Sequence, residues 1–188
     1  MKKVAVRRVN EWDGPAMLKI YAPYVGTPAA PETALPPLAE YIQRIDRYTY
    51  GLGWILCEID SDPAGFCHLT EDRRDPENLF AVEIQLYVKP HYKGIGVGKA
   101  LWTLLRDMME LGSRRKVTAR VDPANEEALA FFREMGFAPA GEADGMTLLE
   151  YALSPADPEA VKPIKPYLIE NLDYERARER AALLVRAE

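Results

Sequence analysis

A strand pattern followed directly by closely spaced glycines constrains this chain most, because few folds place the two together. Over residues 82–88, apolar side chains alternate with polar or aromatic ones, which predicts a strand with one face toward a core and the other toward a cleft. Gly94, Gly96 and Gly98 follow, and residues 100–111 have the pattern of an amphipathic helix. Bare backbone N–H groups before a helix favour an anion, so the segment predicts a cradle for a phosphate or pyrophosphate. A side chain at Gly96 is therefore expected to fill the pyrophosphate site.

Two common nucleotide-binding loops do not fit this spacing. A P-loop needs a glycine where this chain has Lys93, and Ser or Thr where it has Ala100. The dinucleotide-binding loop has the spacing G-x-G-x-x-G, whereas the glycines here follow G-x-G-x-G, and the apolar segment 117–121 lacks the expected acidic end. A tight turn that needs only small residues is the alternative to the anion cradle.

Length and composition indicate one globular domain with an appendage. The chain has 188 residues, a net charge of −5 and no apolar run of membrane-spanning length. It has no basic surface pattern and its N-terminus is too polar for a signal peptide, so we expect a cytoplasmic protein that binds neither nucleic acid nor a membrane. Cys57 and Cys67 are expected to be buried thiols, and the histidine and cysteine spacing indicates no metal site.

The order of patterns predicts a mixed α/β (α+β) fold, with a mixed central sheet and helices on both of its faces. Strands are expected over residues 4–9, 54–59, 65–70, 82–88, 116–121, 137–140 and 146–153. Helices are expected over residues 11–21, 38–47, 100–111, 125–135 and 167–186. The proline-rich segment 23–37 is expected to be irregular.

Two motifs in this order resemble the GNAT superfamily of acetyl-CoA-dependent N-acetyltransferases. The signature Q/R-x-x-G-x-G/A of that family is similar to residues 93–98, with Lys93 at the Gln/Arg position. A second signature, N-x-x-A-x-x-x-Y-x-x-x-G-F, is matched over residues 125–137 except that Phe132 stands at the tyrosine position. The resemblance covers residues 4–153 and is greatest to the phosphinothricin acetyltransferase branch.

The resemblance implies the GNAT fold, in which a splayed pair of strands holds acetyl-CoA as co-substrate. It implies that backbone groups of one strand pair with the pantetheine arm and that the glycine loop binds the pyrophosphate. The implied coenzyme-binding residues are Leu86, Tyr87, Val88, Lys93, Gly94, Ile95, Gly96, Val97, Gly98, Lys99, Asn125 and Phe132.

The resemblance also implies that Glu83 is the general base. An amine must lose a proton before it attacks a thioester, and a carboxylate with the ordinary pKa of about 4.3 is a poor match, so burial or a water relay has to raise its effectiveness. The alternative is a solvated side chain that attracts a cationic substrate. The general acid is unassigned because Phe132 cannot donate a proton; Tyr87, Tyr92, His68 and water are the candidates.

The acceptor is expected to bind against the segment 21–33 and the charged loop 71–78. Four side chains of the first segment are predicted to contact a small polar amine, although tyrosines there also suit packing: Tyr21, Tyr24, Thr27 and Thr33. Arg73 and Arg74 either pair with a carboxylate of the acceptor or belong to a solvated loop.

The resulting hypothesis is an N-acetyltransferase for the primary amine of a small molecule, an amino acid or an analogue such as phosphinothricin or methionine sulfone. The alternatives are a peptide or protein amine acetyltransferase and a non-catalytic acetyl-CoA-binding sensor. Residues 1–153 are predicted to form the acetyltransferase domain, and residues 154–188 a proline-rich linker and C-terminal helix that packs on the protein or on a dimer mate. The family often dimerises, which favours a homodimer.

Overall fold

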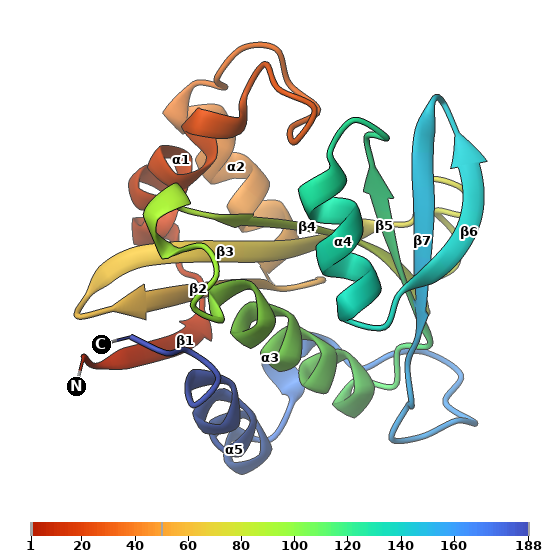
Figure 1. The fold of residues 1–188 in the computed structure, drawn as a ribbon. Coiled ribbons are helices and arrows are strands. Elements are labelled where there is room, and N and C mark those ends of the chain that lie inside the picture. The colour runs from red at the N-terminus through yellow and green to blue at the C-terminus, as the bar shows by residue number, and fades with distance from the viewer. Residues whose placement is uncertain (1, 50, 188) are drawn as a thin grey trace.

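A seven-stranded mixed sheet organises the chain, in the order β1-β2-β3-β4-β5-β7-β6, with helices on both faces (Figure 1). The structure is a computed structural model that describes residues 2–49 and 51–187; Met1 and Glu188, the outer ends of the two predicted segments, lie outside them. Neighbouring strands are antiparallel except β4 and β5, which are parallel. This arrangement confirms the predicted mixed α/β fold.

The elements have the following bounds. The strands are β1 (Val4–Arg8), β2 (Trp54–Ile59), β3 (Asp62–Glu71), β4 (Ala81–Val88), β5 (Lys116–Val121), β6 (Ala138–Ala143) and β7 (Met146–Ala152). The α-helices are α1 (Gly14–Tyr21), α2 (Leu38–Thr49), α3 (Val97–Leu111), α4 (Glu126–Glu134) and α5 (Asn171–Ala182). Short 3-10 helices occupy Glu11–Asp13, Ala22–Tyr24, Pro90–Tyr92 and Pro166–Leu168.

The hairpin between β2 and β3 is tighter than the sequence indicated. Asp60 and Ser61 have positive φ values of 50° and 66°, and Ile59 already pairs with Asp62. A two-residue turn with both residues at positive φ matches the twist of the strands it joins. For this reason β3 starts at Asp62 and not at residue 65.

Two helices are shorter than predicted. Asn10 accepts the N–H of Trp12 at 2.9 Å and caps a 3-10 turn, so α1 begins only at Gly14. The expected helix 167–186 is reduced to α5, because Pro166 begins a separate 3-10 turn before it.

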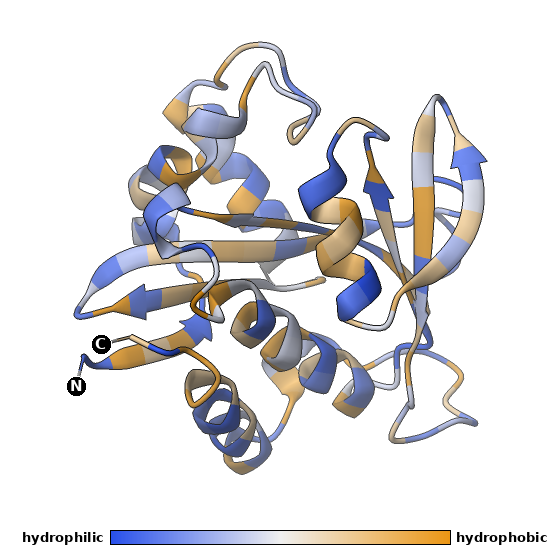
Figure 2. Cartoon of the chain, viewed as in Figure 1, coloured by the Kyte–Doolittle hydropathy of each residue, from blue (hydrophilic) through white to orange (hydrophobic). Residues whose placement is uncertain are grey.

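The two faces of the sheet bury separate apolar clusters. The helices α1 and α2 cover one face, where Met17, Ile20 and Phe66 are fully buried. The helices α3 and α5 lie on the other, where Leu101, Trp102 and Leu104 pack against the sheet. In Figure 2 the flanking helices carry apolar residues on one side and polar residues on the other. This burial fixes the sheet between two helical layers.

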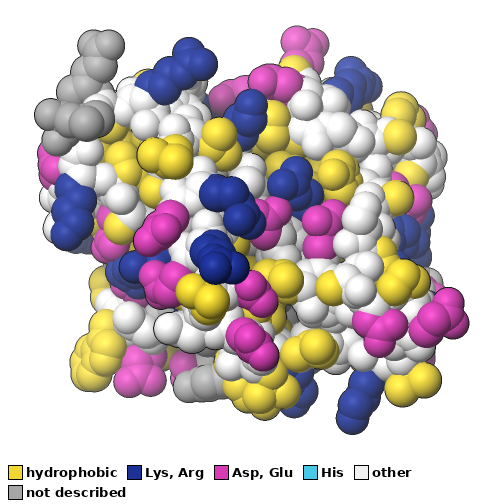
Figure 3. Space-filling view, turned by 90° about the horizontal axis from the view of Figure 1, so that it is seen from below, with side chains coloured by type: hydrophobic (Ala, Val, Ile, Leu, Met, Phe, Trp, Pro, Cys, Tyr) yellow, Lys and Arg dark blue, Asp and Glu magenta, His cyan; other side chains and the backbone are white. Residues whose placement is uncertain are grey.

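The segment beyond residue 153 packs on the same core. Helix α5 lies against α3 and β1, and Ala177 and Ala181 are fully buried there. The hydroxyl of Tyr174 accepts the backbone N–H of Arg8 at 2.8 Å. Figure 3 shows acidic and basic side chains interspersed over the face seen from the α5 side. The sequence left open whether this helix packs on the protein or on a dimer mate. In the structure it packs on the protein itself.

The parallel strands β4 and β5 separate after a short paired stretch. They pair from Ala81 opposite Lys116 to Ile84 opposite Ala119 and no further. The following residues 85–88 of β4 keep β3 as their partner on one side, while β5 turns toward β7 (Figure 1). An unpaired strand edge is left in the middle of the sheet, which is where the candidate site lies.

Three further observations concern the cysteines, membrane-spanning helices and metal sites. Cys57 and Cys67 are buried free thiols, as predicted. No helix within residues 2–49 and 51–187 is both long and apolar enough to cross a membrane. In the same residues, no three His, Cys, Asp or Glu side chains gather where they could hold a metal ion.

Candidate active site

A cavity of about 910 Å³ opens where β4 and β5 separate. Its walls come from β4, the glycine loop 93–99, the end of β5, α4 and the C-terminal residues 183–186. Glu83 and all the residues predicted to bind the coenzyme line it. The size is typical of sites that enclose a small organic ligand.

The glycine loop presents unpaired backbone donors to this cavity. The N–H groups of residues 94–99 have no acceptor among the described residues, and the first hydrogen bond after them joins Ala100 N–H to Gly96 O at 2.9 Å. Gly96 precedes α3 with φ of 99°, a conformation that favours glycine. Free N–H groups and the positive end of a helix dipole together attract an anion.

The structure gives a reason for Gly96 that the sequence did not indicate. A Cβ built on Gly96 lies 2.1 Å from the backbone oxygen of Leu184. The C-terminal residues therefore require glycine at this position. That a side chain there fills the pyrophosphate site stays a prediction. A Cβ on Gly98 would lie 3.0 Å from the ring of Phe131, so that glycine makes room for the α4 wall.

Lys93 and Lys99 both lie on the glycine loop but differ in their ion pairs. Lys93 Nζ pairs with a carboxylate oxygen of Glu127 at 2.8 Å, and its charge also lies 5.3 Å from the ring centroid of Tyr24. Lys99 is exposed and has no ion pair with a described residue. Lys99 is thus the freer cation of the two.

Asn125 and Phe132, which are predicted to bind the coenzyme, also have contacts that stabilise α4. Asn125 Oδ1 accepts the N–H of Ala128 at 3.1 Å and caps the helix. Phe132 is 7% exposed and packs edge-on against Phe131 and Phe137, with ring centroids 5.3 and 5.0 Å away. The wall at this point is apolar and offers no proton.

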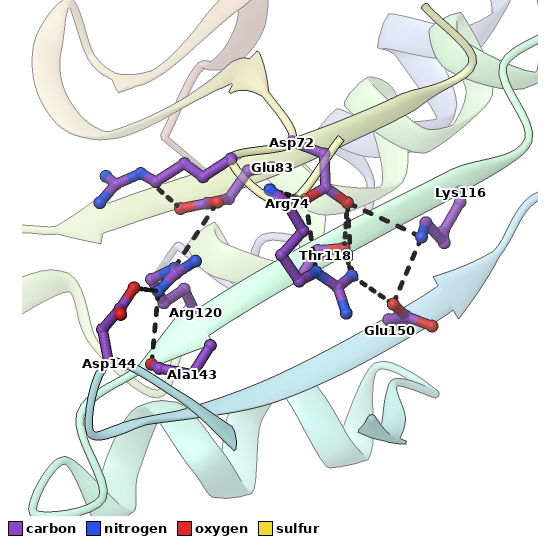
Figure 4. A network of polar contacts seen from close by, with 10 residues as sticks. Asp72, Arg74, Glu83, Lys116, Thr118, Arg120, Ala143, Asp144 and Glu150 are labelled. Carbon is purple, nitrogen blue, oxygen red and sulfur yellow. Dashed lines mark hydrogen bonds and ion pairs between the residues drawn. The ribbon is translucent and has the colours of Figure 1, made fainter. Parts of the chain in front are cut away.

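Glu83 is buried on β4, with only 2% of its surface exposed. Its two carboxylate oxygens lie 3.5 Å from Nε of Arg73 and 3.8 Å from Nε of Arg120; Figure 4 shows the second of these contacts. Burial raises the pKa of Glu83, and the two arginines offset this only in part. The alternative of a solvated side chain is therefore wrong.

A polar network near Glu83 joins the segment that follows β3 to the strands β5 and β7 (Figure 4). Arg74 bonds to Asp72, Glu150 and Thr118, the last at 3.0 Å. Burial alone would raise the pKa of Asp72, but the hydrogen bonds and charge of Arg74 outweigh it and the pKa is lowered. Arg74 is exposed but engaged with these partners, and it does not line the cavity.

The candidates for a general acid differ in access to the cavity. His68 does not line it: the ring is buried 3.9 Å from that of Trp54, and burial lowers its pKa to about 3. Tyr87 and Tyr92 do line it. Tyr92 donates its hydroxyl proton to Asp62 at 2.9 Å, and burial raises the pKa of Tyr87 well above the usual range. His68, neutral and out of reach, is not a proton donor to this cavity.

Of the four residues predicted to bind the acceptor, Tyr24 lines the cavity, with its hydroxyl bonded to the carbonyl of Val88. The other three do not line it. Tyr21 bonds to Glu32, Thr27 closes a turn onto Tyr24 O at 2.6 Å, and Thr33 is exposed. Irregular segments satisfy their own polar groups, and no periodic pattern predicts which side chains turn inward.

Sequence reasoning missed several residues of the cavity. Gln85, Arg120 and Asp144 line it, as do residues 28–31. Arg120 follows two places after Thr118, the partner of Glu83, so strand periodicity carried a signal for it. Asp144 pairs with Arg120 at 3.1 Å from the turn between β6 and β7, which no local pattern indicates.

Comparison with known proteins decides the family. Residues 15–137 match the sequence profile of the Acetyltransferase (GNAT) family. The chain belongs to this family. This GNAT protein is 32% identical over 142 residues to the phosphinothricin N-acetyltransferase of Alcaligenes faecalis, which covers 72% of this chain and 71% of that protein.

Two further proteins are similar to this GNAT protein, one in sequence and one in structure. It is 35% identical over 97 residues to the 5-NmdU N-acetyltransferase of Pseudomonas phage PaMx11, covering 51% of this chain and 65% of that protein. A crystal structure of a phosphinothricin acetyltransferase from Sinorhizobium meliloti in complex with AcCoA superposes with a TM-score of 0.74 at 22% identity, over 85% of this chain and 92% of that one. The latter likeness shows the shared fold.

Proposed function

We propose that this GNAT N-acetyltransferase transfers the acetyl group of acetyl-CoA to the primary amine of a small, amino-acid-like molecule. The observation that carries the proposal is the buried Glu83, with its raised pKa, in the same cavity as the free N–H groups of residues 94–99. The phosphinothricin N-acetyltransferase at 32% identity supports the choice of acceptor class.

The residues present fit acetyl-CoA. Its pyrophosphate matches the free N–H groups of the loop at the start of α3. Its pantetheine arm carries amides, which match the edge of β4 at residues 85–88 that β5 leaves unpaired. Phe131 and Phe132 give the same cavity an apolar wall against which the thioester end can lie.

In this proposal Glu83 takes the proton that the ammonium of the acceptor must lose, directly or through one water. The nitrogen lone pair then forms a bond to the thioester carbonyl carbon. The C–S bond breaks with its electron pair on sulfur, and the nitrogen gives up its second proton to water, which leaves a neutral amide. Coenzyme A departs as a thiolate that takes a proton from water. No side-chain acid is needed, which agrees with Phe132 at the position where a proton donor is usual in the family.

The charges around Glu83 favour an acceptor that carries an anion beside its amine. Arg73 is half exposed and lies on the cavity wall, and Arg120 faces it across the carboxylate of Glu83. A guanidinium group binds a carboxylate or phosphinate through paired hydrogen bonds. An α-amino acid or its analogue presents both groups, the amine toward Glu83 and the anion toward Arg73.

The test is release of free thiol from acetyl-CoA with a panel of amino acids, methionine sulfone, methionine sulfoximine, phosphinothricin, polyamines and short peptides. We expect turnover with one or more of the amino-acid-like compounds. Turnover with peptides alone would replace the proposal with the peptide-amine alternative. Acetyl-CoA binding without any turnover would favour the sensor alternative.

A further inference from the structure

The residues that follow α5, 183–187, lie directly on the glycine loop; we call them the C-terminal segment. The backbone N–H of Arg186 donates to the carbonyl of Ile95 at 2.8 Å. The carbonyl of Leu184 lies so close to Gly96 that a Cβ there would meet it at 2.1 Å. The match to the GNAT profile ends at residue 137, so this contact comes from a part of the chain that the family match does not cover.

The C-terminal segment is held by well-packed structure. Helix α5 buries Ala177 and Ala181 against α3, and Arg180 pairs with Asp107 of α3 at 3.1 Å. The backbone then turns, with Leu184 N–H bonded to Ala181 O at 3.1 Å. The helix α5 packs on α3, and the glycine loop leads into α3, so the C-terminal segment and the loop are joined to the same helix.

Arg186 brings an unused charge to the cavity. It lines the cavity wall, is exposed, and its guanidinium group has no partner among the described residues. Lys99 is unpaired on the same loop, whereas Lys93 is already bonded to Glu127. A guanidinium group beside a ring of free N–H groups is suited to a phosphate.

We propose that the C-terminal segment is part of the coenzyme site: its backbone holds the glycine loop in place, and Arg186 binds a phosphate of acetyl-CoA. This inference rests on the proposed use of acetyl-CoA. Coenzyme A carries a pyrophosphate and a 3′-phosphate, and either group has the chemistry that Arg186 recognises.

The test is equilibrium binding by calorimetry of coenzyme A and of dephospho-coenzyme A, which lacks the 3′-phosphate. We compare the unaltered protein with Arg186→Ala and Arg186→Lys. The matched control is Arg176→Ala, which removes the same charge from an exposed position of α5 outside the cavity. Thermal unfolding of each variant without ligand checks that it is folded.

We expect Arg186→Ala to weaken coenzyme A binding about 10-fold or more, as loss of a hydrogen bond to a charged group does. Arg186→Lys should recover part of the loss, and Arg176→Ala should bind normally. If Arg186→Ala leaves the affinity for dephospho-coenzyme A unchanged, the partner is the 3′-phosphate; an equal loss for both ligands identifies the pyrophosphate.

Coenzyme A affinity equal in Arg186→Ala and the unaltered protein would overturn the inference and leave the proposed function intact. Failure of the unaltered protein to bind coenzyme A would overturn both. Hydrogen exchange adds a measurement that needs no variant. Backbone amides of residues 184–187 should exchange more slowly when coenzyme A is bound, and unchanged exchange would contradict a role of this segment in the site.

Discussion

At the residue scale, the burial of Glu83 gives the site its chemistry. An exposed glutamate is too weak a base for an ammonium, but desolvation raises the pKa of this one while Arg73 and Arg120 keep its charged form accessible. The same burial makes the charged carboxylate costly for the folded state. Catalysis and stability therefore make opposite demands on this residue.

Glu83→Gln tests the raised pKa of Glu83 without any acceptor. Because the folded protein binds this proton more tightly than the unfolded chain does, the stability that the proton confers is present at low pH and is lost as the pH rises. The loss begins near the usual glutamate pKa of about 4.3 and ends above the raised pKa. Thermal unfolding across this window should show the difference in Tm moving in favour of the variant. A difference that stays constant, or moves toward the unaltered protein, would contradict the raised pKa.

Gly94 and Gly96 both have positive φ but differ in their surroundings, so alanine at Gly94 is a control for alanine at Gly96. Both have positive φ, 79° and 99°, so alanine at either position costs roughly 1–2 kcal/mol in backbone strain. Gly96→Ala in addition forces a Cβ against Leu184, whereas nothing lies within 4 Å of a Cβ at Gly94. Denaturant unfolding without ligand should therefore give a larger loss of free energy of unfolding for Gly96→Ala. Equal losses would mean that the C-terminal segment does not rest on the loop.

At the element scale, α4 depends on Asn125 for its start, and this role can be separated from coenzyme binding. Asn125→Ala removes the cap and should lower the free energy of unfolding by about 1 kcal/mol. Asn125→Asp keeps an acceptor for the N–H of Ala128 and should restore stability. It lacks the side-chain amide donor, however, so the predicted contact with coenzyme A is lost.

Unfolding curves and coenzyme A titrations of the two Asn125 variants measure these effects. Stable Asn125→Asp protein with weakened binding supports both roles of the residue. Normal coenzyme A affinity in that variant would leave Asn125 as a helix cap and nothing more.

The elements also show what the sequence was able to predict. Alternation over β4 and the glycines before α3 predicted both elements and their place in the site, because period and backbone conformation are local properties. The start of β3 was missed because Asp60 and Ser61 adopt positive φ without glycine. Of the residues predicted to bind the acceptor, Tyr21 and Thr27 do not line the cavity, because their hydroxyl groups are bonded to Glu32 and to the carbonyl of Tyr24. That they contact the acceptor stays a prediction.

At the scale of the whole molecule, the C-terminal extension is the feature that local patterns could not place. The pattern of α5 predicted a helix, but its docking on α3 and β1, and the return of residues 183–187 to the glycine loop, depend on contacts between distant parts of the chain. The division into residues 1–153 and 154–188, the homodimer and the cytoplasmic location stay predictions.

The central claim is that Glu83 accepts the proton of an amine during acetyl transfer. The most direct measurement is thiol release from acetyl-CoA by the unaltered protein and by Glu83→Gln with the best acceptor, alongside calorimetric acetyl-CoA affinity. The exposed Glu142→Gln serves as the control. Loss of a general base should lower kcat about 10²–10⁴-fold while acetyl-CoA affinity is unchanged. Equal kcat values for Glu83→Gln and the unaltered protein would contradict the account.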